Sequence, residues 1–318
     1  MLDYHLHLLP HGGGAAMRPL DAGLVREYAG RAGAAGVREI AVTEHLFRFA
    51  EAQALLDGWW EDEPDPRLRA QTRAYLASER IAWSLDEYVA AVVEAAADPG
   101  EGAAAIRLGL EVDYYPGRMD AVARLLARHP FDVLLGSVHW LGAWGFDQYD
   151  DPVVAAEWDA RAAEAVWDAY VAAVEAMAGS GVCDVLAHVD LAKVTGVRAP
   201  DDGFAERLVK AASAHDLCVE VSSAGWRKPV GEAYPAPALL AAMHDAGVGI
   251  TFASDAHDPD TVGVRIGEVV STAIGAGYTA VCTFSARMAR PTAIGEPPVQ
   301  GDQGDPAGQA SQAGEGVA

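Results

Sequence analysis

Short apolar runs rich in β-branched residues recur along the chain and alternate with alanine-rich, amphipathic stretches. Seven of these runs have the length and composition of buried strands: Leu2–Leu6, Val37–Thr43, Ala104–Val112, Phe131–Val138, Val182–Ala187, Leu217–Val221 and Val248–Ser254. Five stretches between them are typical of helices: Leu20–Ala35, Arg118–His129, Pro152–Gly179, Gly203–His215 and Pro235–Ala246. Regular alternation of strand and helix predicts a parallel sheet, closed or open.

Two segments depart from this alternation. Residues 46–100 are longer than a simple crossover and contain the turn-rich stretch Trp59–Pro66, so we expect an insertion after the second strand that forms a lid or rim. From about Arg290 onward the chain is rich in Gly, Pro and Gln and has almost no large apolar residues. Such a segment cannot offset its ordering entropy, which predicts a disordered tail over residues 291–318 after a single domain over residues 1–290.

Composition narrows the class of protein. The 318 residues are 51% hydrophobic, which is enough for one large α/β barrel or for two ordinary domains. There is no run of about 18 apolar residues that could cross a membrane. A motif of metal-binding type, His5-Leu6-His7, lies where cleavage of a secretory signal would remove it, and the three cysteines are far apart with no CxxC spacing. We therefore expect a cytoplasmic protein with reduced thiols and no membrane partner; the oligomeric state is left open.

The charge restricts the partners. The formal net charge of −23 comes from 46 acidic and 23 basic residues. Such a field repels polyanions and argues against general nucleic-acid binding. A small phosphorylated substrate is compatible with it if bound cations and a few arginines reverse the local potential inside the pocket.

Seven of the ten histidines lie at or just beyond the C-terminal ends of predicted strands, where barrel enzymes place their active sites. They are His5, His7, His11, His45, His139, His188 and His257. The carboxylates that accompany them are Glu44, Glu111, Asp113, Asp190 and Asp255. Residues two apart on a strand face the same side, so His5 and His7 can reach one metal ion. Imidazole and carboxylate ligands together suit zinc, iron or manganese.

These residues occur in motifs that resemble, in order, those of the polymerase and histidinol phosphatase superfamily. The motifs are His5-Leu6-His7, Pro10-His11-Gly12, Thr43-Glu44-His45, Gly109-Leu110-Glu111-Val112-Asp113-Tyr114, Ser137-Val138-His139, Ala187-His188 and Ser254-Asp255-Ala256-His257. More narrowly, Val219–Pro229, followed by Tyr234-Pro235, is similar to the histidinol-phosphate phosphatase branch. The resemblance covers about residues 1–290. It implies a distorted, TIM-like (β/α)7 barrel that binds three divalent metal ions.

The same resemblance implies which residues bind the three ions. The sets are His5, His7, Glu111 and Asp255 for the first ion, Glu111, His139 and His188 for the second, and His11, His45 and His257 for the third. Two ions bridged by Glu111 would bring the pKa of a shared water towards neutrality and so produce a hydroxide aimed at phosphorus. Glu44 and Asp113 are candidates for orienting ligand histidines.

Further residues are expected to bind the substrate or move protons. The phosphoryl transition state spreads negative charge over its equatorial oxygens, so cationic side chains near them should help most. The candidates are Arg227 first, then Lys228, Lys193 and Arg198. The residues expected to take part in catalysis are Glu111, Asp255, His257 and Asp190, and either Asp190 or a histidine beside a metal would protonate the leaving alkoxide.

Three functions remain open from the sequence. The leading hypothesis, implied by the branch resemblance, is hydrolysis of L-histidinol phosphate to L-histidinol and inorganic phosphate in histidine biosynthesis. The second is a phosphoesterase of the same kind that acts on a nucleotide, a sugar phosphate or a nucleic-acid end. The third is a non-catalytic metal-binding module, although structural sites are usually closed and mononuclear.

Overall fold

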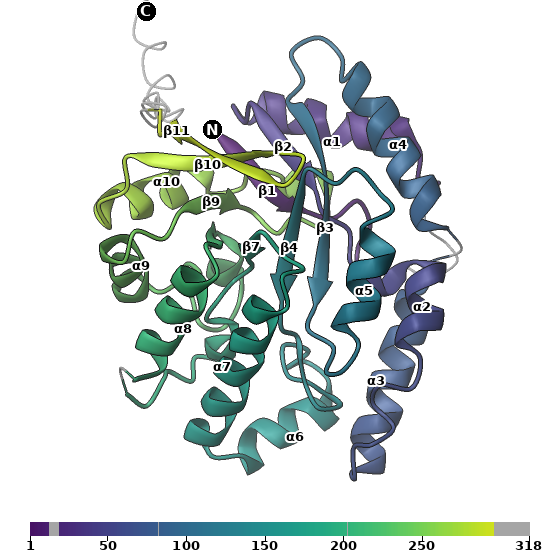
Figure 1. Ribbon diagram of the computed structural model, residues 1–318, viewed down its shortest axis with the longest axis vertical. Coiled ribbons are helices and arrows are strands. Elements are labelled where there is room, and N and C mark those ends of the chain that lie inside the picture. The colour runs from purple at the N-terminus through teal and green to yellow at the C-terminus, as the bar shows by residue number, and fades with distance from the viewer. Residues whose placement is uncertain (13–18, 82, 202, 296–318) are drawn as a thin grey trace, which may run out of the picture.

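The computed structural model describes residues 1–12, 19–81, 83–201 and 203–295. Its centre is a seven-stranded sheet in which every neighbouring pair of strands is parallel (Figure 1). In sheet order the strands are β1 (Leu2–Leu6), β2 (Glu39–Val42), β3 (Ala105–Asp113), β4 (Val133–Ser137), β7 (Val185–Leu186), β8 (Cys218–Ser222) and β9 (Ile250–Ala253). Each predicted strand corresponds to one strand of this sheet, and their order in the sheet is their order in the sequence.

The two edge strands of the sheet meet just beyond the end of β9. The amide of Asp255 donates a hydrogen bond to the carbonyl of His5 (2.8 Å), and the amide of His7 donates to the carbonyl of Ala256 (2.7 Å). These bonds place the C-terminal end of β1 beside the residues that follow β9, so the sheet is nearly closed. The predicted fold, a distorted seven-stranded TIM-like barrel, is confirmed.

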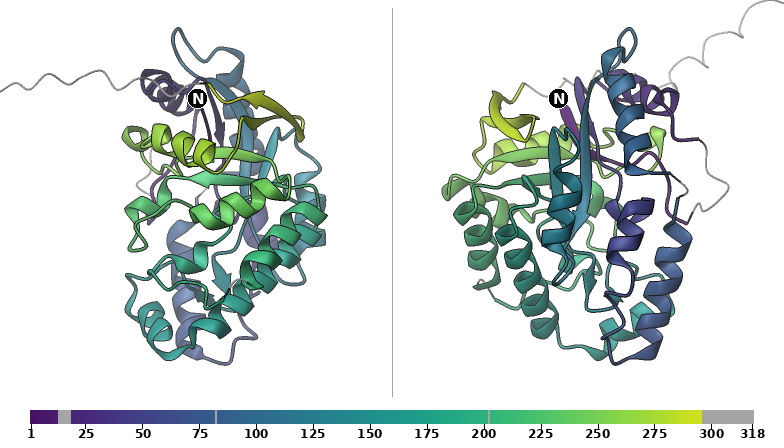
Figure 2. Two further views of the ribbon diagram at one scale, coloured as in Figure 1. Left: turned by 90° about the vertical axis from the view of Figure 1, so that its left-hand side faces the viewer. Right: turned by 45° about the vertical axis from the view of Figure 1, so that its right-hand side comes forward.

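Helices surround the barrel, while its strands are buried almost throughout, as is typical of parallel sheets (Figure 2). The helices outside the insertion are α1 (Ala22–Ala34), α5 (Met119–Leu126), α6 (Pro152–Ala160), α7 (Ala163–Gly179), α8 (Gly203–Ala214), α9 (Pro237–Asp245) and α10 (Ile266–Gly275). Among the described residues, none of the helices combines the length and the apolar character that crossing a membrane requires.

The predicted helix over residues 152–179 is divided into α6 and α7. The backbone is extended at Arg161 (φ −95°, ψ 138°) and at Ala162 (φ −66°, ψ 135°). The guanidinium of Arg161 lies 4.7 Å from the centroid of the Trp144 ring. No proline or glycine marks this break, so tertiary packing rather than local sequence accounts for it.

The segment predicted to be an insertion, residues 46–100, is mostly helical. It contains η2 (Leu46–Arg48), α2 (Ala50–Leu56), α3 (Pro66–Glu79) and α4 (Leu85–Ala97). Asp65 caps α3, with a proline in the first turn, and a capping box of Ser84 and Glu87 begins α4. Helix α4 lies beside α1 and β3, as the crossover helix of a barrel does, whereas α3 lies near α6 (Figure 1).

The C-terminal boundary differs from the prediction. After α10, strands β10 (Ala280–Ser285) and β11 (Met288–Ala293) form an antiparallel hairpin, so secondary structure continues past residue 290. The turn residues Ala286 and Arg287 have φ values of 48° and 64°, which usually call for Gly or Asn, and the usual hairpin signal is therefore missing. Asp132 accepts hydrogen bonds from both of their amides (3.1 and 2.8 Å) and holds the turn. Of the predicted tail, residues 296–318 lie outside the described residues.

Candidate metal centre

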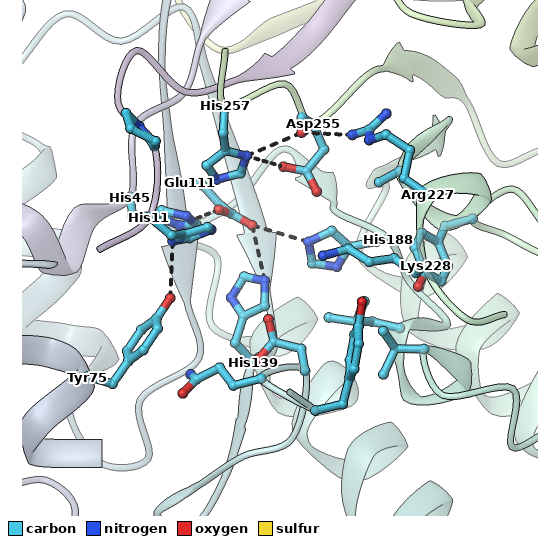
Figure 3. Close-up of a pocket in the computed structure, with 18 of the residues that line it drawn as sticks. His11, His45, Tyr75, Glu111, His139, His188, Arg227, Lys228, Asp255 and His257 are labelled. Carbon is cyan, nitrogen blue, oxygen red and sulfur yellow. Dashed lines mark hydrogen bonds and ion pairs between the residues drawn. The ribbon is translucent and has the colours of Figure 1, made fainter. Parts of the chain in front are cut away.

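The C-terminal ends of the barrel strands bring five of the predicted histidines, with Glu111 and Asp255, together around one cavity (Figure 3). His5 and His7 come from the end of β1, Glu111 from β3, and Asp255 from the residues after β9. His139 and His188 follow β4 and β7. Parallel strands in a barrel end on the same side, which is why residues more than 250 positions apart in sequence become neighbours.

The first predicted ligand set has the spacing of a metal site. His5 Nε2 lies 3.1 Å from His7 Nε2, and these two atoms lie 3.8 and 3.5 Å from Asp255 Oδ1. The same two nitrogens lie 3.5 and 3.6 Å from Glu111 Oε2. Ligands at metal distances of about 2.0–2.1 Å in a tetrahedron are separated by roughly 3.4 Å. His5, His7 and Asp255 therefore fit one cation, and Glu111 lies at ligand spacing from both histidines.

The second predicted set shares Glu111 with the first through its other oxygen. Glu111 Oε1 lies 3.3 Å from His188 Nε2 and 3.7 Å from His139 Nε2. The ligand atoms of these three side chains lie within 4.8 Å of one another. One carboxylate thus faces histidines on both sides, which is the arrangement that a bridging ligand requires.

The third predicted set is assembled less closely. The rings of His45 and His257 lie beside His7, and ligand atoms of these three residues lie within 4.8 Å of one another. The predicted third member, His11, has its ring centroid 4.3 Å from that of His257 and 5.3 Å from that of His45. His11 is not part of that group of three, and its Nδ1 lies 3.2 Å from the hydroxyl of Tyr75 (Figure 3). His11 is near the site, but at 46% exposure its side chain is the most accessible of the seven histidines.

Several buried atoms of this cluster have no hydrogen-bond partner among the described residues. They include Nε2 of both His45 and His257 and Oε2 of Glu111. Glu111 Oε2 lies only 2.6 Å from His45 Nδ1, but the contact lacks hydrogen-bond geometry. Unsatisfied buried polar atoms are costly, and a cation bound between them would satisfy them. The donor set, imidazole nitrogens with carboxylates, therefore fits transition-metal ions.

At Glu111, His45 and His257 the pKa shifts favour the protonation states that bind metals. Burial alone would raise the pKa of the Glu111 carboxyl, but His45 and His5 hold this pKa well below its usual range. Burial, reinforced by His7, holds the pKa of His45 and of His257 well below the ordinary value. Metals bind ionised carboxylates and neutral imidazoles, and these are the forms that the shifts of Glu111, His45 and His257 favour.

Carboxylates behind the cluster orient its histidines. Asp113 Oδ1 lies 2.5 Å from Nδ1 of His139, as expected from the sequence. Burial lowers the pKa of His139, but Asp113 and Glu111 outweigh it and raise this pKa to about 10. Glu220 was given no role from the sequence, although an acidic residue within an apolar strand was a signal. Its Oε2 lies 2.8 Å from His5 Nδ1, and its Oε1 accepts a hydrogen bond from the His188 amide (2.8 Å).

Two of the ligand residues have an unfavourable backbone conformation. His188 and Asp255 have φ values of 30° and 54°, in a region that residues other than glycine rarely adopt. The contacts from Glu220 to the His188 amide and from the His5 carbonyl to the Asp255 amide hold these conformations. Backbone strain of this kind persists where the surrounding structure over-determines it, which is common at functional sites.

The loop that carries His11 is held by an ion-pair network that the sequence analysis missed. Arg48, which is fully buried, lies 2.9 Å from Glu44 Oε2 and 2.7 Å from Glu79 Oε2. Glu79 is the last residue of α3, and it also accepts a hydrogen bond from the amide of Gly12 (2.6 Å). The insertion therefore positions the His11 loop against the barrel.

The cavity in front of the cluster has a volume of about 420 Å³. Besides the histidines, its wall includes Arg227 and Lys228, the two substrate-binding candidates that the structure places in the site (Figure 3). The guanidinium of Arg227 donates hydrogen bonds to the backbone carbonyls of Ser254 (2.7 Å) and Asp255 (3.1 Å). The same arginine thus lines the cavity and supports the ligand-bearing segment after β9.

The other candidates lie outside this wall. Lys193 is buried, and its ammonium contacts Asp190 Oδ2, Glu232 Oε1 and the carbonyl of Ala233, each at 2.8 Å. Arg198 is half exposed and also pairs with Glu232. None of Asp190, Lys193 and Arg198 lines the cavity as the described residues define it. Their charges are used within a separate network, which we call the Lys193 network (Asp190, Lys193, Arg198 and Glu232).

Comparison with known proteins agrees with this geometry. The model of the PHP domain family matches residues 21–224. A Deinococcus radiodurans protein named "Probable histidinol-phosphatase" is 35% identical over 292 residues, which are 92% of this chain and 99% of that protein. The crystal structure of histidinol phosphate phosphatase from Lactococcus lactis, in complex with zinc, L-histidinol and phosphate, has a similar fold, with a TM-score of 0.65 at 18% identity. The similarity covers 91% of this chain and 98% of that one.

Proposed function

The chain belongs to the PHP domain family, and from that premise we propose that it is a metal-dependent phosphomonoesterase that hydrolyses L-histidinol phosphate to L-histidinol and inorganic phosphate. The observation that carries the proposal is the position of Glu111, whose two oxygens face different sets of histidines, three beside Oε2 and two beside Oε1. The relative of 35% identity, matched over nearly its whole length, supports the substrate.

The residues present fit three divalent ions, which we propose as the cofactors; zinc, iron and manganese all suit the ligands. When bound, such ions acidify a water molecule and neutralise phosphate oxygens. His5, His7 and Asp255 would hold the first ion, His139 and His188 the second, and Glu111 would bridge them. His45 and His257 would hold the third, with His11 completing it after a rotation of its exposed ring away from Tyr75.

Arg227 is proposed to bind the phosphoryl oxygens. One of its terminal nitrogens is anchored on the carbonyls of Ser254 and Asp255, which fixes the guanidinium at the cavity wall. The other terminal nitrogen donates to the hydroxyl of Ser223 (3.4 Å), and the remaining N–H groups can donate to the substrate in the fixed fork that matches phosphate. Such a donor is most useful where the transition state gathers negative charge.

Asp255 and His257 are the proposed acid–base groups for the leaving alkoxide. Their side chains are 18% and 22% exposed and line the cavity, whereas the ligands behind them are almost fully buried. Asp255 Oδ1 lies 3.6 Å from His257 Nδ1, so a proton held by this pair would be within reach of a bound ester. Asp190 has no such access, because it is buried and does not line the cavity, and its Oδ2 is bound by Lys193 and by the amide of Ala236.

A small ester suits the charge of the protein better than a polymer does. The net charge of −23 opposes the approach of nucleic acid, which supports a small phosphorylated substrate and no nucleic-acid partner. Two of the three cysteines are buried and all three are free, which agrees with action in the reducing cytoplasm.

The test is release of inorganic phosphate by the purified protein loaded with zinc or manganese. We expect L-histidinol phosphate to exceed nucleotides and sugar phosphates by orders of magnitude in kcat/KM, with activity lost on chelation and restored by metal. A higher kcat/KM for another ester would contradict the proposed substrate but leave the proposed phosphomonoesterase activity intact. Thermal stabilisation by metal without hydrolysis of any ester would overturn the enzymatic proposal in favour of a metal-binding module.

A further inference from the structure

Asp147 is a cavity carboxylate to which no role has yet been assigned. It lies between β6 (Trp144–Gly145) and α6, and its side chain lines the cavity in front of the metal centre. Its Oδ1 is withdrawn from solvent and has no hydrogen-bond partner among the described residues. A carboxylate oxygen removed from water without a partner is unfavourable, and a bound cationic donor would offset this cost.

The other carboxylates of the cavity wall already have a role. Glu111 and Asp255 belong to the metal centre. Asp258 caps the short helix η5 (Pro259–Thr261), where its Oδ1 accepts a hydrogen bond from the amide of Asp260 (2.8 Å). Asp147 belongs to none of the metal-binding groups found among the described residues. Outside the metal centre, Asp147 Oδ1 is therefore the buried carboxylate oxygen of this wall for which the described residues supply no partner.

The wall that includes Asp147 also presents aromatic rings. Tyr75, Trp140, Tyr149 and Tyr234 all line the same cavity, and the rings of Tyr75 and Trp140 pack edge to face at 6.0 Å. Lys228, on the same wall, has its ammonium 5.9 Å from the centroid of the Tyr149 ring. Aromatic faces attract cations and stack on planar rings, so they are suited to a cationic or heteroaromatic group.

We infer that Asp147 binds a cationic nitrogen, an ammonium or imidazolium, on the alcohol part of the substrate. The inference rests on the proposed function, because it assigns the two ends of one ester to two parts of the cavity. The metal centre and Arg227 take the phosphate, and Asp147 with the aromatic rings takes the nitrogen. Esters with no such cation, including sugar phosphates, leave Asp147 unpaired, so the same residue selects against them.

The test compares esters that differ only in their nitrogen groups. The substrates are L-histidinol phosphate, 3-(imidazol-4-yl)propyl phosphate without the ammonium, 2-amino-3-phenylpropyl phosphate without the imidazole, and 3-phenylpropyl phosphate with neither. The variants are Asp147→Asn and, as a matched control, Asp258→Asn, which removes the same charge from the same wall but keeps a capping oxygen. Metal content and melting temperature establish that each variant is folded and loaded.

The measured quantity is the ratio of kcat/KM for L-histidinol phosphate to that for 3-phenylpropyl phosphate. We expect Asp147→Asn to lower this ratio by about 10- to 100-fold, because hydrogen bonds to charged groups are strong. Asp258→Asn should change it far less. If kcat/KM relative to 3-phenylpropyl phosphate falls for the 2-amino ester, Asp147 binds the ammonium. If it falls for the imidazolyl ester, Asp147 binds the imidazolium. An unchanged ratio overturns the inference, even if all four rates fall together, because Asp147 would then act on the reaction centre or the fold.

Failure of the proposed function would give a different result. If the wild-type protein hydrolyses phosphate esters but not L-histidinol phosphate, the substrate assignment fails while Asp147 is still testable. The pair 2-aminoethyl phosphate and propyl phosphate then supplies the ratio. A drop of that ratio in Asp147→Asn supports a cation-binding carboxylate, and an unchanged ratio overturns it.

Discussion

The metal centre and the Lys193 network both contain buried charged side chains, but they differ in how these charges are paired. In the Lys193 network the ammonium has three oxygen partners, each at 2.8 Å. In the metal centre, Glu111 Oε2 lies within 3.6 Å of three imidazoles without a hydrogen bond to any of them among the described residues. In the first cluster the buried cation already has its partners within the fold, whereas the second cluster is completed by a cation.

This difference separates a structural role from a catalytic one. Both clusters combine residue types that are rarely buried, so composition and burial do not distinguish them. What distinguishes them is whether donor and acceptor atoms remain without a partner in the protein. A side chain whose hydrogen-bonding groups all have partners within the fold has no group left to bind a substrate. On this criterion we propose a structural role for Lys193 and a substrate-binding role for Arg227, which lines the cavity.

The largest expected effect follows from removing the bridging charge at the metal centre. Glu111→Gln should lower kcat/KM for L-histidinol phosphate by on the order of 10³-fold, since two cation sites lose their shared carboxylate. Metal content of the purified variant should fall at the same time. The matched change Glu232→Gln in the Lys193 network should leave both quantities near the wild-type values. If the Glu111→Gln enzyme kept its metal content and its kcat/KM, the proposed distinction between a catalytic metal centre and a structural Lys193 network would be wrong.

The next effect concerns the donor that faces the cavity. Arg227→Met should lower kcat/KM by about 10²-fold and weaken inhibition by inorganic phosphate, because the transition state loses a charged donor. Arg227→Lys should recover only part of the loss, since an ammonium lacks the planar fork. Steady-state kinetics with phosphate as a competitive inhibitor measure both quantities. Unchanged inhibition by phosphate in Arg227→Met would place the phosphate elsewhere.

A smaller effect should come from the carboxylate behind the ligands. Glu220→Gln keeps the size of the side chain but weakens its hold on His5, and changes of this kind typically cost about 10- to 100-fold in metal affinity or activity. Titration with zinc or manganese should show weaker binding, and excess metal should restore most of kcat. Such rescue is characteristic of a positioning residue; a loss that metal does not rescue would argue against that role.

The smallest effect on catalysis is expected in the Lys193 network. Lys193→Met should lower the free energy of unfolding by roughly 3–5 kcal/mol, because it leaves Asp190 buried without its counter-charge. The folded fraction should keep a kcat/KM close to that of the wild type. Urea unfolding and kinetics at a temperature well below the melting point measure the two quantities. A stable Lys193→Met protein with a large rise in KM would instead assign Lys193 to the substrate.

Much of the architecture could be predicted because local patterns determine it. Each of the seven strands is a short apolar run, and each predicted run became a strand of the barrel. The hairpin over residues 280–293 was missed because its turn, Ala286-Arg287, contains neither Gly nor Asn and depends on Asp132, more than 150 positions away. The break before α7 was missed for a similar reason, since Arg161 packs on Trp144 with no local signal.

The sequence by itself determined which residues could bind metals, because their types and their positions after successive apolar runs are local properties, and parallel strands bring such positions to one end of a barrel. Only the tertiary structure decided which charged side chains are paired within the protein and which have atoms without a partner. Lys193 meets Glu232 after 39 positions and Arg48 meets Glu79 after 31, whereas Asp147 Oδ1 meets no described partner. The pairing of a buried charge depends on long-range contacts, and no local pattern specifies them.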